Sequence, residues 1–372
     1  MADSQDYAYM ARALRLARRG LYTTDPNPRV GCVLINAGRI VGEGWHERAG
    51  EGHAEVLALA AAGPQARGAT AYITLEPCCH HGRTPPCSHA LLAAGIHRAV
   101  VAMQDPNPRV AGQGLAELQA AGVETECGIL EAEARELNPG FIMRMVYGRP
   151  FVRCKLAMSL DGRTALATGE SQWITGEAAR LDVQHWRARA SAIMTGVGTV
   201  LADDPGLNVR LAGERLRQPL RVILDPELAT PPSARTLRLD GRVLIFTAVT
   251  AAERWAPLEA AGAQILSAPR QGLGLELTAV LDELARREIN ELHLECGATL
   301  AGAMLQAGLI DEMLIYLAPL LLGDSALGLF HLPELRRMSE RIPLEIREVR
   351  AIGRDWRFTA RPVSHAYPNR CC

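Results

Sequence analysis

Two short stretches in the first third of the chain, GHAEV at 52–56 and TLEPCCHHGRTPPC at 74–87, combine residue types that bind soft divalent metals. His53, Cys78 and Cys87 offer the imidazole nitrogen and thiolate sulfurs that zinc takes in tetrahedral sites. One ion can hold all three only if the two stretches meet in space, so this pattern strongly constrains the fold. We expect His53 at or just before the first turn of a helix, Cys78 in a turn, and Cys87 at the start of the next helix.

Glu55 follows His53 by two residues. Inside a helix, residues two apart point to different sides, so both can face one site only if His53 stands at the helix start, which Gly52 permits. Three protein ligands leave a fourth position for water, and zinc lowers the pKa of that water to about 7. With Glu55 as the proton carrier, the pattern favours hydrolytic removal of an amine from an electron-poor ring carbon.

Two alternatives remain for this group. A structural zinc site would need a fourth protein ligand, which Cys32, Cys79, His80 or His81 could supply. A site without metal would leave the cysteines as buried thiols. An acid two residues from a ligand argues against a closed structural site, because such a site has no use for it.

The first third of the chain alternates strand-like and helix-like segments. Short β-branched runs predict strands, and Ala/Leu-rich runs that stop at glycine predict helices. This order predicts a helix-covered sheet, with strands at 30–36, 69–75 and 97–103 and helices at 54–63 and 87–95. The motif DPNPRV occurs twice, at 25–30 and 105–110, and its paired prolines predict an extended turn each time.

The segment NPGFIMRMVYGRPF at 138–151 predicts a domain boundary, because glycine and proline punctuate it at both ends. We therefore expect two domains, 1–147 and 148–372. The second has further apolar runs, as buried parallel strands do. Its last stretch, LEIREVRAIGRDWRFTARPV, predicts an antiparallel hairpin around Gly353 and Arg354.

Charge and cysteine usage narrow the classes of partner. Lys and Arg number 40 against 41 Asp and Glu, so the chain lacks the basic excess typical of nucleic-acid binding, and a small-molecule substrate is the better expectation. Nine unevenly placed cysteines favour metal or thiol chemistry in a reducing compartment. No apolar run approaches a membrane span, and the N-terminal segment predicts an amphipathic helix rather than a signal peptide. We expect a cytoplasmic protein.

The second domain contains two glycine-bearing turns. TGVGTVLADDP at 195–205 lacks the third glycine of the dinucleotide fingerprint, so we do not expect a Rossmann fold. In LECGATLAGAMLQAG at 294–308, a strand is expected to end at Glu295 and a helix to start near Thr299. Free N–H groups at that start would hold a phosphate. The alternative is a well-capped helix without a ligand.

The motif HAE…EPCxHHGRTPPC resembles the deaminase half of the bifunctional riboflavin-biosynthesis family, the diaminohydroxyphosphoribosylaminopyrimidine deaminase / 5-amino-6-(5-phosphoribosylamino)uracil reductase. The segments SLDGRTA, GESQWIT and GVGTVLADDPGLNVR resemble its reductase half, so the resemblance covers nearly the whole chain. It implies an α/β protein with a cytidine-deaminase-like three-layer α/β/α domain followed by a dihydrofolate-reductase-like α/β domain. The chain departs from the family at Cys79, where serine is usual.

The resemblance also implies a substrate pocket in the first domain. The matching positions would surround the pyrimidine and its ribose phosphate: Asn27, His46, His80, Arg83, Asp105 and Asn107. Each DPNPRV turn would then present its asparagine to the same pocket. An amide offers the donor and acceptor that a pyrimidinone edge needs, and a guanidinium suits a phosphate.

In the second domain, the resemblance implies NADPH as cofactor. The positions that would touch NADPH are Ala157, Trp173, Thr199, Asp203 and the turn formed by Gly297, Ala298, Thr299, Leu300, Ala301, Gly302 and Ala303. Those that would hold the substrate are Ser171, Arg187, Leu207, Arg210 and Glu295. Asp203 is a candidate proton donor, although an Asp in ADDP can equally form a turn.

Lys155 is the only lysine in the chain. Arginine therefore serves wherever a solvated positive charge is wanted, and we expect the single lysine where a compact ammonium is needed, for a substrate phosphate or hydroxyl beside the nicotinamide. Chance is the alternative explanation of one residue.

The residue patterns together with the resemblance imply a bifunctional enzyme that acts on a small pyrimidine ribose phosphate, with one Zn²⁺ per deaminase domain and NADPH in the reductase domain. It would act in riboflavin biosynthesis as a homo-oligomer, without a nucleic-acid or membrane partner. The first rival is another nucleotide deaminase fused to an unrelated reductase. The second is a zinc-stabilised nucleotide-binding module without turnover.

Overall fold

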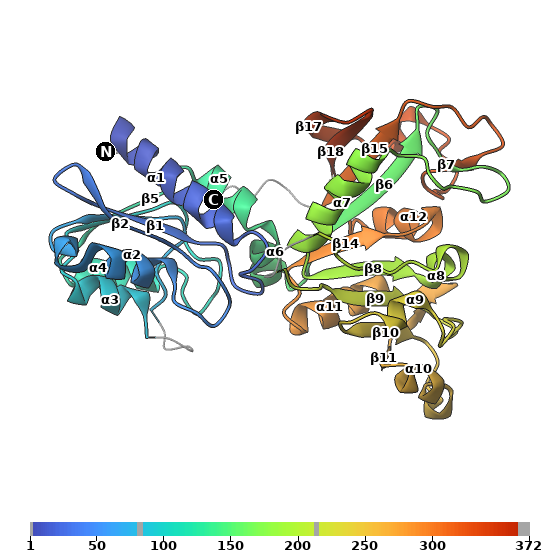
Figure 1. Cartoon of the computed structure of the whole chain (residues 1–372), viewed down its shortest axis with the longest axis horizontal. Coiled ribbons are helices and arrows are strands. Elements are labelled where there is room, and N and C mark those ends of the chain that lie inside the picture. Colours follow the sequence, from blue (N-terminus) through green and yellow to red (C-terminus); the bar gives the residue numbers. More distant parts are fainter. Residues whose placement is uncertain (1–2, 80–84, 212–215, 364–372) are drawn as a thin grey trace. The chain divides into compact units, whose positions relative to one another are not determined.

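The chain folds into two compact units, Met1–Arg149 and Pro150–Cys372 (Figure 1). The structure is a computed structural model that describes residues 3–79, 85–211 and 216–363. Each unit has its own sheet and its own hydrophobic core, and each is described separately below. Within the described residues, no helix is both long enough and apolar enough to cross a membrane.

The first unit is a three-layer sandwich around a five-stranded sheet of order β2-β1-β3-β4-β5. β1 is antiparallel to β2 and β3, whereas β3, β4 and β5 are parallel. The strands are β1 Gly31–Asn36, β2 Arg39–Trp45, β3 Thr70–Ile73, β4 Arg98–Val101 and β5 Glu124–Cys127. The helices are α1 Ser4–Ala17, η1 Arg18–Gly20, α2 Ala54–Ala62, η2 Gly63–Ala66, α3 Cys87–Ala93, α4 Gln113–Ala120, α5 Glu131–Leu137 and α6 Pro139–Tyr147.

Two hydrophobic clusters fill the two faces of this sheet. Residues of α1, α5 and α6 pack on one face, with Met10 and Phe141 among them. Residues of α2, α3 and α4 pack on the other face, with Ala58 and Leu118 among them. The expected strand and helix order is confirmed, and the sheet gains β2 and β5, which the sequence patterns had not indicated.

Helix α2 lies directly on the backbone of β2, and two glycines make this approach possible. A Cβ atom on Gly42 would lie 2.2 Å from the carbonyl oxygen of Ala58, and one on Gly44 would lie 2.4 Å from that of Ala54. Neither distance is compatible with a side chain, so α2 can rest at this depth only over glycine. The first turn of α2 carries the candidate site residues.

An ion-pair network fastens α1 to the sheet. The buried Asp6 carboxylate accepts hydrogen bonds from Arg98 Nη1 and Nη2 at 2.8 and 3.0 Å and from Tyr72 Oη at 2.6 Å. The bond from Arg98 is the main cause that lowers the pKa of Asp6 to about 2. The charged form of Asp6 therefore stabilises the folded unit.

Asp6→Asn should destabilise the first unit by about 2 kcal/mol at neutral pH, which is the order of magnitude that corresponds to the lowered pKa. A lowered pKa means that this stabilisation is present above the unfolded value of 3.8 and is lost as the pH falls toward about 2. Urea unfolding of the wild-type and Asp6→Asn proteins between pH 7 and pH 2 measures the difference in their free energies of unfolding. A difference between them that did not shrink below pH 4 would contradict the role of the ionised carboxylate.

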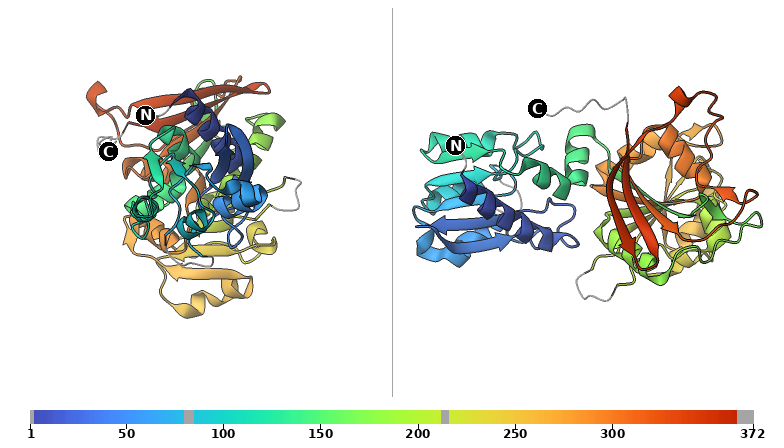
Figure 2. Two further views of the ribbon diagram at one scale, coloured as in Figure 1. Left: turned by 90° about the vertical axis from the view of Figure 1, so that its left-hand side faces the viewer. Right: turned by 90° about the horizontal axis from the view of Figure 1, so that it is seen from above.

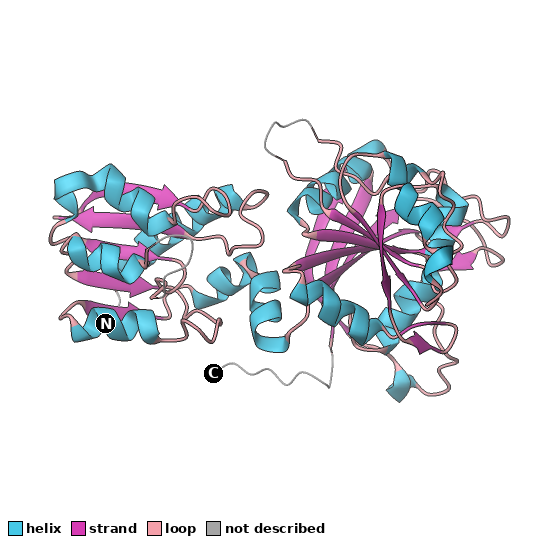
Figure 3. Cartoon of the chain, turned by 90° about the horizontal axis from the view of Figure 1, so that it is seen from below, coloured by secondary structure: helices cyan, strands magenta, loops and turns pink. Residues whose placement is uncertain are grey.

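The second unit is built on a nine-stranded sheet of order β11-β10-β9-β8-β14-β6-β15-β18-β17. The strands from β11 to β15 are parallel, and β18 and β17 add an antiparallel hairpin at one edge. The strands are β6 Phe151–Ser159, β8 Ala192–Gly196, β9 Leu220–Leu224, β10 Val243–Thr247, β11 Ala263–Ser267, β14 Glu291–Glu295, β15 Glu312–Ala318, β17 Leu344–Ile352 and β18 Asp355–Pro362. Helices surround this twisted sheet in Figure 3.

The helices of the second unit follow the strands in an α/β order. They are α7 Glu177–Arg189, α8 Val197–Asp203, α9 Arg235–Arg238, η3 Ala252–Arg254, α10 Ala256–Ala260, α11 Leu277–Arg286, α12 Ala298–Gln306 and η4 Met338–Glu340. Two small pairings complete the unit: β7 Arg163–Ala165 with β16 Leu327–Gly328, and β12 Arg270–Gln271 with β13 Gly274–Leu275. The expected terminal hairpin is confirmed, and it turns at Gly353 with a φ of +63°.

Candidate active site

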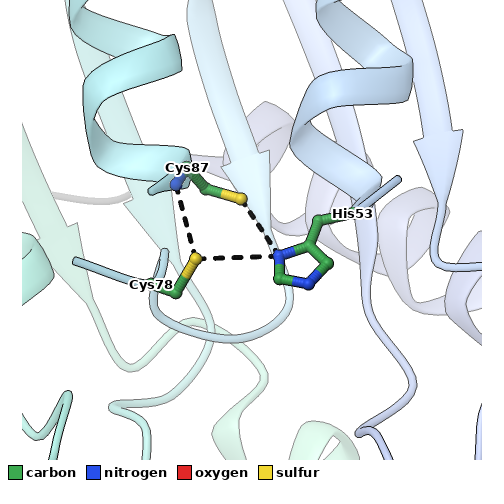
Figure 4. Close-up of side chains that lie close together, drawn as sticks. All are labelled: His53, Cys78 and Cys87. Carbon is green, nitrogen blue, oxygen red and sulfur yellow. Dashed lines mark hydrogen bonds between the residues drawn. The ribbon is translucent and has the colours of Figure 1, made fainter. Parts of the chain in front are cut away.

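Three side chains from separate parts of the first unit converge on one point (Figure 4). His53 is the N-cap of α2, Cys87 is the first residue of α3, and Cys78 lies in the connection between β3 and α3. His53 Nδ1 lies 3.2 Å from Cys87 Sγ and 3.6 Å from Cys78 Sγ. Zinc bonds of ordinary length at a tetrahedral angle place such ligand atoms about 3.6 Å apart, so this group fits a zinc ion.

The protonation of the group also suits a cation. The hydrogen bond from Cys87 is the main cause that lowers the pKa of Cys78 to about 4, while the same bond raises the pKa of Cys87. The partnership with Cys78 raises the pKa of His53. One thiolate is thus already favoured in the protein alone, and a bound cation deprotonates a coordinating thiol.

Glu55 lies in the first turn of α2 and is 3% exposed. Burial raises the pKa of this carboxyl to about 7, and the nearby charge of His53 opposes the rise only in part. A carboxyl that exchanges its proton near neutral pH is well suited to general acid–base catalysis. The position of His53 at the helix start, which the sequence predicted, is the reason that both residues belong to one site.

Two of the four residues considered as a fourth metal ligand stand apart from the group. Cys32 is buried in β1, and burial raises the pKa of its thiol. Cys79 Sγ faces Arg109 O at 3.8 Å and Gln113 Oε1 at 3.7 Å. Among the residues that the structure describes, only His53, Cys78 and Cys87 form such a group. His80 and His81 lie outside the described residues, as does Arg83.

Asn27 and His46 are next to the metal group. Asn27 Nδ2 lies 3.0 Å from His46 Nε2, and His46 Nδ1 lies 3.1 Å from the carbonyl oxygen of Gly52. The rings of His46 and His53 meet edge to face, with centroids 5.3 Å apart. Burial lowers the pKa of His46, so the neutral ring donates from Nδ1 to Gly52 and accepts from Asn27 at Nε2.

The second DPNPRV turn is held by its own side chains. Asp105 accepts a hydrogen bond from the Asn107 N–H at 2.8 Å, and Asn107 Oδ1 accepts one from the Arg109 N–H at 3.1 Å. Burial raises the pKa of Asp105 to about 7, and Cys78 is among the nearby negative groups that add to the rise. Asp105 is therefore close enough to Cys78 to sense its charge, and Asn107 is hydrogen-bonded to Asp105. Their contacts with a ligand stay predictions.

Glu76 is a site residue that the sequence patterns did not single out. Its buried carboxylate accepts hydrogen bonds from three backbone N–H groups: those of Asp105 at 3.1 Å and Gly112 at 2.9 Å in the loop that follows β4, and that of Leu115 at 3.2 Å in the first turn of α4. Because Glu76 stands two residues before Cys78, it ties the metal-binding turn to the loop of Asp105. One sequence feature could have indicated Glu76: it is a charged residue directly after the predicted buried strand 69–75, within LEPC.

Glu76→Gln should raise the KM of the deaminase reaction by about tenfold, because a carboxamide offers one acceptor oxygen where the carboxylate offers two, and at least one buried N–H group loses its partner. Zinc content and reductase activity should not change. Glu133→Gln, at an exposed position of α5, is the matched control. A Glu76→Gln protein with an unchanged KM would contradict this positioning role.

In the second unit, strand register brings the expected substrate residues together. Lys155 of β6 pairs directly with Glu295 of β14. Arg187 of α7 forms a bidentate ion pair with Glu295 and also donates to the carbonyl oxygen of Asn208 at 3.0 Å, beside Leu207. Burial alone would raise the pKa of the Glu295 carboxyl. The Arg187 guanidinium lowers it by a larger amount, so the pKa of Glu295 lies well below its usual range.

Lys155 is the register partner of Glu295 through the backbone, but within the described part of the chain its ammonium forms no hydrogen bond or ion pair. Burial lowers the pKa of its ammonium, and the nearby Glu295 carboxylate opposes this change. Arg187 and Arg210 also lie within electrostatic range of each other. The cluster therefore presents cationic groups around one buried carboxylate, which suits an anionic substrate.

The starts of α8 and α12 lie side by side, as a shared cofactor site requires. A Cβ on Gly196, just before α8, would lie 3.5 Å from the Leu300 side chain of α12. Gly297 and Thr299 are exposed at the start of α12, Thr199 is half-buried near the start of α8, and Asp203 is exposed at the opposite end of α8. Gly302 behaves differently, because a Cβ there would lie 2.1 Å from the carbonyl oxygen of His331. Because Gly302 has no side chain, the backbone of His331 can lie directly against α12 at this position.

The remaining expected residues lie in β6, in the connection between β7 and α7, and in α12. Ala157 belongs to β6 and pairs with Tyr316. Ser171 and Trp173 lie in the connection between β7 and α7, where the Arg180 guanidinium stacks 4.7 Å over the Trp173 ring. Ala298, Ala301 and Ala303 belong to α12, and Ala301 is buried in the core. Their contacts with NADPH or substrate stay predictions.

The fold and the site define the class: a zinc-dependent deaminase domain joined to a reductase domain. Residues 3–103 match the cytidine and deoxycytidylate deaminase zinc-binding region, and residues 150–358 match the RibD C-terminal domain. The chain belongs to the RibD family of bifunctional riboflavin-biosynthesis enzymes.

Similar proteins span the full length of the chain. The riboflavin biosynthesis protein RibD of Escherichia coli K12 is 49% identical over 94% of this chain and 98% of its own. RibD of Acinetobacter baumannii has a solved structure that is 47% identical to this chain, with a TM-score of 0.90. The match covers 97% of this chain and 99% of the Acinetobacter chain. The Thermotoga maritima structure of a diaminohydroxyphosphoribosylaminopyrimidine deaminase / 5-amino-6-(5-phosphoribosylamino)uracil reductase has a TM-score of 0.84, 32% identity and coverage of 96% and 98%.

Proposed function

We propose that this bifunctional enzyme catalyses two consecutive steps of riboflavin biosynthesis. The first unit would hydrolyse the 2-amine of 2,5-diamino-6-(5-phosphoribosylamino)pyrimidin-4-one and release ammonia. The second would reduce the ribosyl group to ribityl with NADPH and give 5-amino-6-(5-phosphoribitylamino)uracil. The observation that carries this proposal is the convergence of His53, Cys78 and Cys87 beside the buried Glu55. The name of the Thermotoga maritima protein states the same two activities.

In the deaminase step, His53, Cys78 and Cys87 would hold zinc, which supplies a Lewis acid and an ionised water at neutral pH. Glu55 would accept the proton of that water and pass it to the departing amine. Asn27, His46 and the second DPNPRV turn would hold the edge of the pyrimidine. The lowered pKa of His46 supports this role, because a neutral imidazole that holds Asn27 adds no positive charge beside the pyrimidine.

In the reductase step, NADPH supplies the hydride, and the protein would orient it toward the ribose C1. Arg187 and Arg210 would hold the anionic end of the substrate, and Lys155 would place its ammonium beside a substrate hydroxyl or phosphate. The register of Lys155 opposite Glu295 supports this arrangement, because the carboxylate opposes the lowering of the ammonium pKa that burial causes.

Ammonia release and NADPH oxidation, measured on the same purified protein together with its zinc content, test the proposal. The expected result is both activities on the riboflavin precursor and one zinc per chain. Zinc-dependent ammonia release from cytidine or its phosphates, without activity on the precursor, would establish the rival nucleotide deaminase. Zinc binding without turnover of either kind would establish the binding module.

We further propose that the protein acts in the cytoplasm as a homo-oligomer on a small pyrimidine ribose phosphate. Seven cysteines that the structure describes are free thiols, and two of them must stay reduced to hold zinc. The balance of acidic and basic residues supports a small-molecule substrate rather than nucleic acid.

A further inference from the structure

A buried histidine lies beside the charged cluster of the second unit. His293 belongs to β14, an interior strand between β8 and β6, whereas the terminal hairpin, red in Figure 2, forms one edge of the sheet. Its side chain is 1% exposed, and among the described residues neither ring nitrogen has a well-aligned hydrogen bond. A buried imidazole in this state is less favourable than an apolar side chain of similar size, which points to a role beyond packing.

Strand register surrounds this ring with charged groups. Arg153 of β6 lies directly opposite His293, and on the other side an isoleucine of β8 does. Residues two apart in a strand share a face, so Glu291 and Glu295 flank the ring within β14. The Glu291 carboxylate already accepts hydrogen bonds from Arg153 at 2.8 Å and from Arg189 at 2.7 Å. Glu295 is therefore the carboxylate that the ring can serve.

Glu295 is contacted by the ring and by one arginine. His293 Nε2 lies 3.3 Å from Glu295 Oε1. Arg187 donates from Nε to the same oxygen at 2.5 Å and from Nη2 to Oε2 at 2.9 Å. Burial lowers the pKa of His293, and the Glu295 carboxylate opposes this change only in part, so the ring is neutral at neutral pH and can donate from Nε2. Two groups thus hold Oε1.

Lys155 is the neighbour that Glu295 does not hold. It lies opposite Glu295 in the register of β6 with β14, so both side chains share a face of the sheet. Opposite charges in a buried setting attract strongly. Within the described part of the chain, however, the Lys155 ammonium forms no ion pair. The contacts with Arg187 and His293 explain this, because they engage both oxygens of the carboxylate.

We infer that His293 is a positioning residue of the reductase site, which keeps the Glu295 carboxylate on Arg187 and away from Lys155. The inference rests on the proposed reductase function, in which Lys155 meets a substrate hydroxyl or phosphate. Without the imidazole, Oε1 loses one of its two contacts, and the carboxylate gains the freedom to turn to Lys155. The ammonium is then paired inside the protein, and the substrate must compete with Glu295 for it.

The single lysine of the chain makes this effect directly measurable. Protein labelled with [ε-¹³C]lysine gives one lysine signal by NMR, and its chemical shift reports the ionisation of Lys155. In His293→Leu, the pKa of Lys155 should lie about one pH unit or more above the wild-type value, because an ion pair with Glu295 favours the charged ammonium. His293→Gln should keep the wild-type value, since its carboxamide places an N–H donor near the position of Nε2.

Steady-state reduction of the deaminated intermediate gives a second readout. His293→Leu should raise the KM for this substrate about tenfold and leave the KM for NADPH unchanged, whereas His293→Gln should stay within about twofold of the wild type. His293→Phe keeps a ring without nitrogen atoms and should behave like His293→Leu, which excludes an effect of lost ring shape. His185→Leu makes the same change at an exposed position of α7 and should alter neither readout.

An unchanged pKa of Lys155 in both His293→Leu and His293→Phe would overturn the inference, as would an unchanged KM for the deaminated intermediate. Equal losses in His293→Leu and His293→Gln would also overturn it, because they would show that the ring only fills space. The NMR titration needs no turnover. A wild-type protein that fails to oxidise NADPH with the deaminated intermediate would instead contradict the proposed reductase function, so the two failures are distinguishable.

Discussion

Glu55→Gln should lower ammonia release by about 10³-fold while the protein keeps its zinc and its NADPH-dependent activity. The carboxyl is buried in the first turn of α2, and burial raises its pKa to about 7. Glutamine has nearly the same shape but cannot carry a proton between water and the departing amine. Steady-state ammonia release from the riboflavin precursor, with zinc measured on the same sample, gives the result.

Two controls make this outcome specific. Glu51→Gln makes the same chemical change at an exposed position just before the site and should leave ammonia release unchanged. Reduction of the deaminated intermediate by the Glu55→Gln protein should match the wild type, because the second unit has its own sheet and core. If Glu55→Gln retained most of its deaminase activity with zinc in place, Glu55 could not be the proton carrier.

Lys155→Met should lower NADPH oxidation by about 10²-fold, which is the usual cost of removing one preorganised charged donor from an active site. Lys155 pairs with Glu295 in the sheet, and its ammonium has no hydrogen-bond partner among the described residues. A substrate hydroxyl or phosphate would supply that partner. Single-turnover reduction of the deaminated intermediate measures the effect on the chemical step.

The choice of lysine is tested by Lys155→Arg, which keeps the charge but replaces a compact ammonium with a planar, wider guanidinium. We expect the arginine variant to stay well below the wild type. Arg242→Met removes one cation at an exposed position and serves as the control. Full reductase activity in Lys155→Arg would show that the single lysine of the chain has no such role.

The metal group was predictable from sequence because its members are chemically rare. Histidine and cysteine at the positions of His53, Cys78 and Cys87 are typical of a zinc site. The fold brings their ligand atoms within 4.8 Å of one another. The placement of His53 at a helix start followed from the spacing of His53 and Glu55 alone. Local geometry and ligand chemistry therefore determine this part of the site.

Other parts of the site depend on contacts between segments that are distant in sequence. Glu76 holds the loop of Asp105 through backbone N–H groups, which carry no residue-specific signal. The pairing of Lys155 with Glu295 depends on the order of strands in the second sheet, which apolar runs alone do not fix. Gly302 looks like part of a ligand turn in sequence, whereas the structure shows its Cα against the backbone of His331.

The glycines beneath α2 have a consequence for inherited variation in this protein. Gly42 and Gly44 are not among the candidate site residues, yet a single added methyl group at either position would push away the helix whose first turn carries Glu55. Such a displacement would move the carboxylate while leaving every reactive side chain intact. A sequence comparison restricted to reactive residues would overlook such substitutions. A glycine-to-alanine change at Gly42 or Gly44 could therefore make an organism depend on riboflavin from its surroundings.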